Sequence, residues 1–141
     1  MSKKSPAIAE RIRAFAGGDL DPHYAGYFDC FNRQLFYEAH DVLEELWLQD
    51  RKGPSGDFYK GLIQLAGAFV HVQKNRPQPA LALLDLAATN LAKYSPLHVQ
   101  LSIAEALQLI DAWRARIRAD SNSRSLLTTP PRLAPKTTVT G

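Results

Sequence analysis

Apolar residues recur along most of the chain at the three- and four-residue spacing of α-helices, and no segment sustains the alternation of a β-strand. Glycines and prolines divide this pattern into segments. The pattern predicts helices over about residues 5–16, 24–50, 57–75, 79–94 and 97–119, with a break in the second near Gln34 or Leu35. The sequence therefore predicts an all-α fold, a compact orthogonal or antiparallel bundle of about five helices.

The last predicted helix carries an apolar seam, and the residues after it do not. The seam residues follow one another at alternating spacings of four and three, which suits packing in a bundle or in a homodimer. They are Val99, Ile103, Ala106, Ile110, Trp113 and Ile117. Residues 121–141 are rich in Ser, Thr and Pro, which predicts a disordered tail. We therefore expect one helical domain over 1–120 and a disordered tail over 121–141.

Chain length and cysteine content indicate how the fold is stabilised and in which compartment the protein works. A chain of 141 residues can bury a working core without disulfides. The single Cys30 cannot form an internal disulfide, and the start of the chain lacks an apolar segment of secretory length, so we expect a cytoplasmic protein. No stretch reaches the roughly 18 uninterrupted apolar residues of a membrane span. The sequence predicts a soluble protein.

The formal net charge of +3 does not lie in the predicted core. Residues 24–113 hold seven basic and ten acidic residues, a net charge of −3, so the basic surplus lies in the two ends. These ends lack interleaved aromatic side chains that would stack on bases. The charge distribution therefore disfavours nucleic acid as a partner.

One predicted helix combines an apolar face with polar residues at its edge. At 100° per residue, His40 lies at the edge of the apolar face beside Trp47, and Glu44 and Tyr37 come next around the helix. The acids expected to face water are Glu38, Asp41 and Glu45. The pair on the boundary between core and solvent is thus His40 and Glu44.

The helix predicted over 57–75 is apolar around most of its circumference. One narrow polar stripe, flanked by glycine and alanine, holds Asp57, Lys60, Gln64, His71 and Asn75. A helix this apolar is normally central in its domain. The stripe has two interpretations: it is the helix's one window to solvent, or it faces the His40 and Glu44 edge across a cleft.

Two blocks of this region resemble a known family. FNRQLFYEAHDVLEELW at 31–47 and FYKGLIQLAGAFVHVQKNRPQPALALLDLAATNLAKYSP at 58–96 are similar to the small all-helical prokaryotic and plastid family catalogued as domain of unknown function 309. The resemblance covers about residues 28–96 and has Asp41 where the family usually has Glu. Its signature positions are Phe31, Asn32, Glu38, His40, Glu44, Trp47, Lys60, Gly61, Gln64 and His71. The resemblance implies a helical fold and the place of a site, but no activity.

One hypothesis for that site is a metal centre. His40 and Glu44 lie four residues apart on a helix, and His71 from the next predicted helix would complete two imidazoles and one carboxylate, a set that suits zinc or iron. Tyr37 and Gln64 would orient these ligands, and Lys60 would face an anion. The protein would then be a metal-dependent hydrolase or oxidoreductase, although HExxH, paired ExxH and cysteine-pair motifs are absent.

The other hypothesis is a binding or structural module. His40 and Glu44 would form hydrogen bonds with Gln64 or His71 and fix the register of two helices, with Trp47 as a core anchor. A small molecule could bind in the same cleft without chemistry. Metal-free acid–base catalysis by His40 and Glu44 also stays open. The sequence favours the binding or structural module and does not name a substrate.

Overall fold

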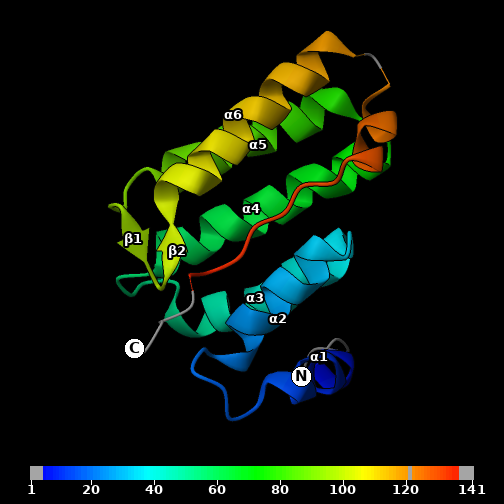
Figure 1. Cartoon of the computed structure of the whole chain (residues 1–141). Coiled ribbons are helices and arrows are strands. Elements are labelled where there is room, and N and C mark those ends of the chain that lie inside the picture. Colours follow the sequence, from blue (N-terminus) through cyan, green and yellow to red (C-terminus); the bar gives the residue numbers. More distant parts are fainter. Residues whose placement is uncertain (1–4, 121, 137–141) are drawn as a thin grey trace.

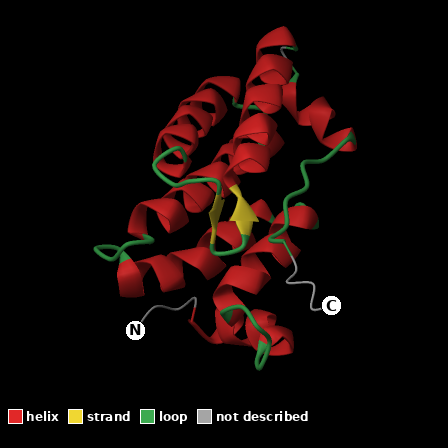
Figure 2. Ribbon diagram, turned by 60° about the vertical axis from the view of Figure 1, so that its left-hand side comes forward, coloured by secondary structure: helices red, strands yellow, loops and turns green. Residues whose placement is uncertain are grey.

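The computed structural model describes residues 5–120 and 122–136, and it confirms the all-α prediction. Its helices and strands follow in chain order, and Figures 1 and 2 show their arrangement. They are α1 (Ser5–Ile12), the 3₁₀ helix η1 (Arg13–Phe15), α2 (Pro22–Asn32), α3 (Phe36–Asp50), α4 (Gly56–Gln73), α5 (Pro77–Leu91), β1 (Leu97–His98), β2 (Leu101–Ser102), α6 (Ile103–Ala119) and the 3₁₀ helix η2 (Ser123–Thr128).

Local chemistry sets the ends of α2 and α3. The side chain of Asp21 accepts a hydrogen bond from the backbone N–H of His23, and Pro22 occupies the first turn of α2. Gln34, with a φ of 62°, ends that helix turn and redirects the chain into α3. The predicted break near Gln34 is therefore confirmed.

The last helix starts later than predicted. Residues 97–102 form a two-stranded antiparallel hairpin, with Leu97 opposite Ser102, and α6 begins only at Ile103. Val99 and Gln100 have φ values of 43° and 62°, which reverse the chain between the strands. The expected helix start at 97 was wrong because the left-handed conformation of these two residues is incompatible with a continuous helix.

The core is built around α4, with α5 and α6 on one side and α2 and α3 on the other (Figure 1). The aromatic ring of Phe69 lies at the centre, with its centroid 5.6 Å from that of Phe31, 5.1 Å from Phe36 and 4.9 Å from Trp113. These rings join α2, α3, α4 and α6. The central position predicted for the 57–75 helix is thus the one that α4 takes.

The apolar seam of α6 is used inside the chain. Ile103, Ala106, Ile110, Trp113 and Ile117 are all buried, at most 3% exposed. α5, α4 and η2 of the same chain pack against this seam. The homodimer predicted through the last helix stays a prediction. Among the described residues, no helix combines the length and apolar character that crossing a membrane requires.

The segment after α6 differs in extent from the predicted disordered tail. η2 packs on α4 and α6, and Leu133 belongs to the same buried core as the helices. We call residues 130–136 the strap, because they run without helix or strand across α4 between α2 and α6 (Figure 1). The packed unit therefore reaches Lys136, and the rest of the predicted tail, residues 121 and 137–141, lies outside the described residues.

Candidate functional site

The predicted site residues of α3 lie at the surface edge of the helix. Tyr37 is 60% exposed, and its ring centroid is 6.4 Å from that of His40. His40 Nδ1 lies 3.1 Å from Asp41 Oδ1, and the His40 side chain is 34% exposed. Trp47 is half-buried and packs on the core. Glu44, also half-buried, shares this face.

The acids of α3 that were expected to face water do not do so fully. Glu45 Oε1 lies 3.1 Å from His23 Nε2, and its other carboxylate oxygen is buried. Glu38 and Asp41 line a small hollow with Arg11 of α1, and the side chain of Asp41 is only 18% exposed. The expectation failed because α1 folds back over this side of α3, which the spacing within α3 could not reveal.

The polar stripe of α4 is used by α5. Gln64 Oε1 accepts a hydrogen bond of 2.8 Å from Asn90 Nδ2, and Lys93 Nζ donates to Asp57 Oδ2 at 2.9 Å. A Cβ on Gly61 would lie 3.0 Å from the Leu91 side chain, so α5 approaches closely here. Lys60 remains exposed. Gln64 thus forms a hydrogen bond with α5. The two interpretations of the stripe, a window to solvent or a face toward His40 and Glu44, did not include this contact.

His71 sits in the last turn of α4, half-buried. Its Nδ1 is buried and has no hydrogen-bond partner among the described residues. Burial lowers its pKa, and the positive charges of Arg76 and Lys74 add to the shift. Within 5–120 and 122–136, no three His, Cys, Asp or Glu side chains are grouped to hold one metal ion. His40, Glu44 and His71 are thus not brought together in this way, and the zinc or iron centre stays a prediction.

A second polar site lies where α2 ends, and here the strap docks. Asn32 Nδ2 donates to the Leu133 carbonyl at 2.8 Å, and the Leu133 N–H donates to Asn32 Oδ1 at 2.8 Å. One carboxamide thus satisfies both backbone groups of one residue. Leu133 is 6% exposed and joins the core between α2 and α6.

The far end of the strap is tied to the hairpin and to α6. The Lys136 N–H donates to the Gln100 carbonyl at 2.5 Å, and Lys136 Nζ lies 2.6 Å from Glu105 Oε1. Glu105 stands in the first turn of α6, where the Ser102 side chain accepts a hydrogen bond from its backbone N–H. Both charged side chains of this pair are about half exposed.

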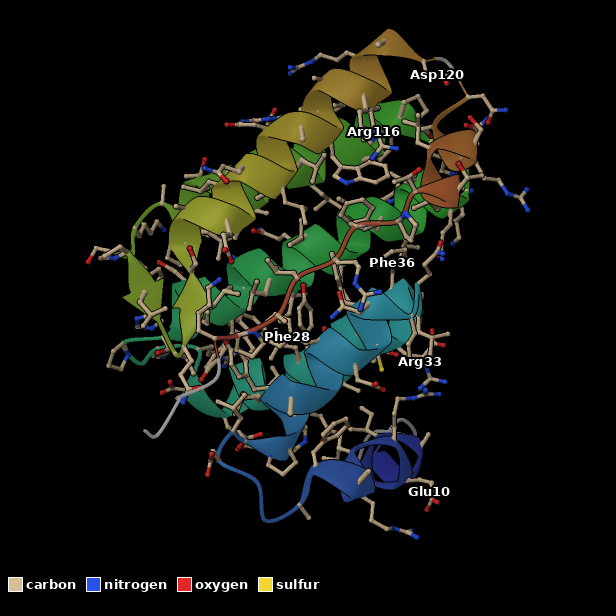
Figure 3. The ribbon with its side chains drawn as sticks, viewed as in Figure 1. Glu10, Phe28, Arg33, Phe36, Arg116 and Asp120 are labelled. Atoms are coloured by element: carbon tan, nitrogen blue, oxygen red, sulfur yellow. The ribbon has the colours of Figure 1, made fainter. Side chains whose placement is uncertain are left out.

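The near end of the strap follows η2, which is anchored separately. Asn75 Oδ1 accepts hydrogen bonds from Ser123 Oγ at 3.2 Å and from the Arg124 N–H at 3.3 Å. Arg116 reaches from α6 toward η2 (Figure 3), where it donates to the Leu126 carbonyl at 2.9 Å. Its guanidinium also lies 4.0 Å from the centroid of the Trp113 ring. η2 is thus held by contacts that do not involve the strap.

The strap lies in a trough that it does not fill. A hollow of about 690 Å³ on one side is lined by residues 14–20, Gln100 and Pro135. A second hollow of about 680 Å³ is lined by Asn32, Glu105 and the strap itself. We define the trough as the surface of α2, α6 and the hairpin that contacts the strap. The two hollows lie beside the strap and are open to solvent.

Comparison with known proteins places part of this site in a family. Residues 24–83 match the family described as Domain of unknown function (DUF309). This segment of the chain is a DUF309 domain. The family predicted from the two sequence blocks is confirmed. Searches of curated proteins and of solved structures find no match.

The residues that match DUF309 include only part of the trough. Asn32 lies within the matched segment, whereas α6 and the strap lie beyond it. The sequence pointed to Asn32 only as a signature position of the resemblance, and it assigned no role to Leu133, Gln100 or Glu105. One sequence feature could have indicated that this part of the tail is ordered: a leucine flanked by prolines among polar residues, in PPRLAP at 130–135.

Proposed function

We propose that this protein is a binding module whose trough takes an extended polypeptide segment, with the strap as its resident ligand. The observation that carries the proposal is the pair of 2.8 Å hydrogen bonds between Asn32 and the backbone of Leu133. This bonding resembles what a neighbouring β-strand offers an added peptide. Because the bonds reach backbone groups, they accept many sequences.

The surroundings of Asn32 support a ligand site over a purely structural tie. The strap has no helix or strand of its own, and two hollows flank it. η2 keeps its own anchors at Asn75 and Arg116, so the strap can leave without pulling η2 from the core. A segment held at a few points beside open space can be exchanged for another.

The metal-dependent alternative lacks a similar basis. His40 Nδ1 lies 3.1 Å from Oδ1 of its neighbour Asp41, and no three His, Cys, Asp or Glu side chains of the described residues are grouped around one position. The buried free thiol of Cys30 is consistent with work in a reducing cytoplasm. We therefore propose a cytoplasmic polypeptide-binding module rather than a metalloenzyme.

The test uses the full-length chain with its trough opened. Leu133→Asp places a charge where the anchor is buried and should eject the strap. A fluorescent peptide of residues 129–138, TPPRLAPKTT, should bind this variant saturably and bind the wild-type chain at least about tenfold more weakly, because the resident strap competes at millimolar effective concentration.

Asn32→Ala in the Leu133→Asp chain supplies the specificity control. It should abolish peptide binding, whereas Asn90→Ala, which removes an amide from the α4–α5 contact, should leave it intact. Circular dichroism and a thermal melt establish that each variant is folded. Absence of peptide binding by a folded Leu133→Asp chain would overturn the proposed function.

A further inference from the structure

We infer that the trough selects segments of the form Pro-x-Leu-x-x-Lys and accepts them in one direction only. This inference rests on the proposed function and names its ligand class. It starts from the exposure of successive strap residues. Pro131 and Leu133 are buried, whereas Arg132 and Ala134 between and after them are exposed. This alternation is that of an extended segment with one face on the protein.

The buried positions determine which side chains the trough can distinguish. Leu133 is the anchor, since it is 6% exposed and contributes to the common core. Replacing a buried leucine by alanine leaves a cavity that the surroundings fill only in part. Arg132 and Ala134 are exposed, so we expect the trough to distinguish their side chains less than those of Pro131 and Leu133. Selectivity therefore falls on the first and third positions of the segment.

Besides Pro131 and Leu133, the trough recognises Lys136, the basic residue three positions after the leucine. Lys136 Nζ lies 2.6 Å from Glu105 Oε1, while its backbone N–H donates to the Gln100 carbonyl. Glu105 stands in the first turn of α6, where the helix dipole attracts negative charge. The ion pair is half exposed, so it sets the register and adds only modestly to affinity.

Charge also fixes the direction of the segment. Glu105 stands at the hairpin end of the trough, and the η2 end carries Arg116 and Arg124. A reversed segment would bring its basic residue toward these two cations and leave Glu105 without a partner. Like charges placed together suppress the wrong arrangement. The preferred ligand therefore runs from the arginines toward the glutamate, as the strap does (Figure 1).

The experiment measures a set of synthetic peptides against the full-length Leu133→Asp chain by fluorescence anisotropy. The native peptide of residues 129–138 is the reference. An analogue with Leu133→Ala should bind at least about 30-fold more weakly. The matched control with Arg132→Ala should bind within about twofold, and Lys136→Glu should weaken binding about fivefold. The retro-sequence TTKPALRPPT, whose lysine lies toward the η2 end when the peptide runs in the direction of the strap, should bind more weakly than the native peptide.

A charge exchange then tests the Lys136 contact directly. The chain carrying Glu105→Lys with Leu133→Asp should prefer the Lys136→Glu peptide over the native one. This reversal of preference cannot arise from a general loss of folding. Equal binding of the native, Leu133→Ala, Lys136→Glu and retro peptides would overturn the selectivity while sparing the proposed function. Absence of binding by the native peptide itself would overturn both.

Discussion

The side-chain amides of Asn90 and Asn32 make hydrogen bonds of two different kinds. Asn90 of α5 donates to Gln64 of α4, a bond between two side chains on helices packed closely at Gly61. Asn32 of α2 bonds instead to both backbone groups of Leu133, a residue 101 positions away in a segment without secondary structure. The first contact joins two helices, and the second holds the strap, which has no helix or strand of its own.

Under the proposed function, the strap can be exchanged for another segment at the Asn32 contact, whereas α4 and α5 stay together at the Asn90 contact. Removing the Asn90 contact leaves α4 and α5 together, because their apolar side chains keep them packed. Removing the Asn32 contact takes away the two hydrogen bonds between Asn32 and the Leu133 backbone, so the strap then relies on the leucine side chain and on the contacts of Lys136. We therefore assign the Asn90 contact to the structure of the helix pair and, under the proposed function, the Asn32 contact to binding.

The largest effect is expected from Leu133→Ala. The loss of a buried anchor should lower the free energy of unfolding by about 2–3 kcal/mol and release the strap. Amide hydrogen exchange should show the protection of the Leu133 N–H lost while that of α4 is retained. The exposed neighbour provides the control, since Arg132→Ala should change neither quantity measurably. Loss of protection throughout α4 would mean that the strap is an integral part of the core.

Asn32→Ala should have the next largest effect. Two backbone groups of Leu133 lose their partner, so the free energy of unfolding should fall by about 1–3 kcal/mol. Asn90→Ala removes one partner of Gln64 and should cost about 1 kcal/mol. Only Asn32→Ala should speed exchange of the Leu133 amide. If Asn90→Ala speeds that exchange equally, the two contacts are not independent and the comparison fails.

The sequence predicted the elements that depend on local pattern. Helical spacing located α4 and α5, and the break between α2 and α3 lies where it was predicted, near Gln34 or Leu35. The hairpin at 97–102 escaped prediction because strands of two residues are too short to show alternation. The strap escaped it because a Ser, Thr and Pro-rich composition is typical of disorder, and its order depends on a trough built by distant helices.

The site was predicted less well than the fold, for a physical reason. A helical wheel shows which residues share a face, but not which neighbour covers that face. Gln64 was therefore placed correctly on a polar stripe while its partner on α5, Asn90, was missed. Asn32 was noticed as a signature position, yet its partner Leu133 lies beyond the family segment. Contacts between distant segments require the assembled fold.

Acid pH should loosen the hairpin end of the trough before the Asn32 end. Burial lowers the pKa of His98 below its ordinary value of 6.5, and its Nε2 lies 2.9 Å from Ser55 Oγ. The unfolded chain takes up the proton first as pH falls, so stability should be complete above about pH 6.5 and decline below it toward the depressed folded pKa. His71 contributes in the same direction.

Urea unfolding at pH 7.5 and 5.5 measures this loss of stability. The His98→Gln variant should show a smaller difference between the two pH values than the wild-type chain. The amide of Lys136, bonded to Gln100 in the hairpin, should exchange faster at pH 5.5 after correction for intrinsic rates. An unchanged pH dependence in His98→Gln would assign the loss to other groups.

A smaller, stabilising effect is expected in the hairpin turn. Val99 and Gln100 both have positive φ, and the branched Val99 is poorly suited to a φ of 43°. Changing the pair to Asn and Gly, which favour this two-residue turn, should raise the free energy of unfolding by about 0.5–1 kcal/mol. Thermal unfolding measures the gain. A decrease would show that contacts of the Val99 side chain outweigh the relief of backbone strain.

The smallest effect is expected at the outer end of the strap. Lys136→Ala removes an ion pair with Glu105 whose two side chains are 54% and 50% exposed, so unfolding should change by about 0.5 kcal/mol or less. The backbone bond from residue 136 to Gln100 remains in this variant. A thermal melt at low and high salt measures the difference, which should shrink as salt screens the pair. If Lys136→Ala instead lowers the free energy of unfolding by more than about 1 kcal/mol at every salt concentration, the contact of Glu105 is structural, like that of Asn90. It is then not part of an exchangeable contact such as the one proposed for Asn32.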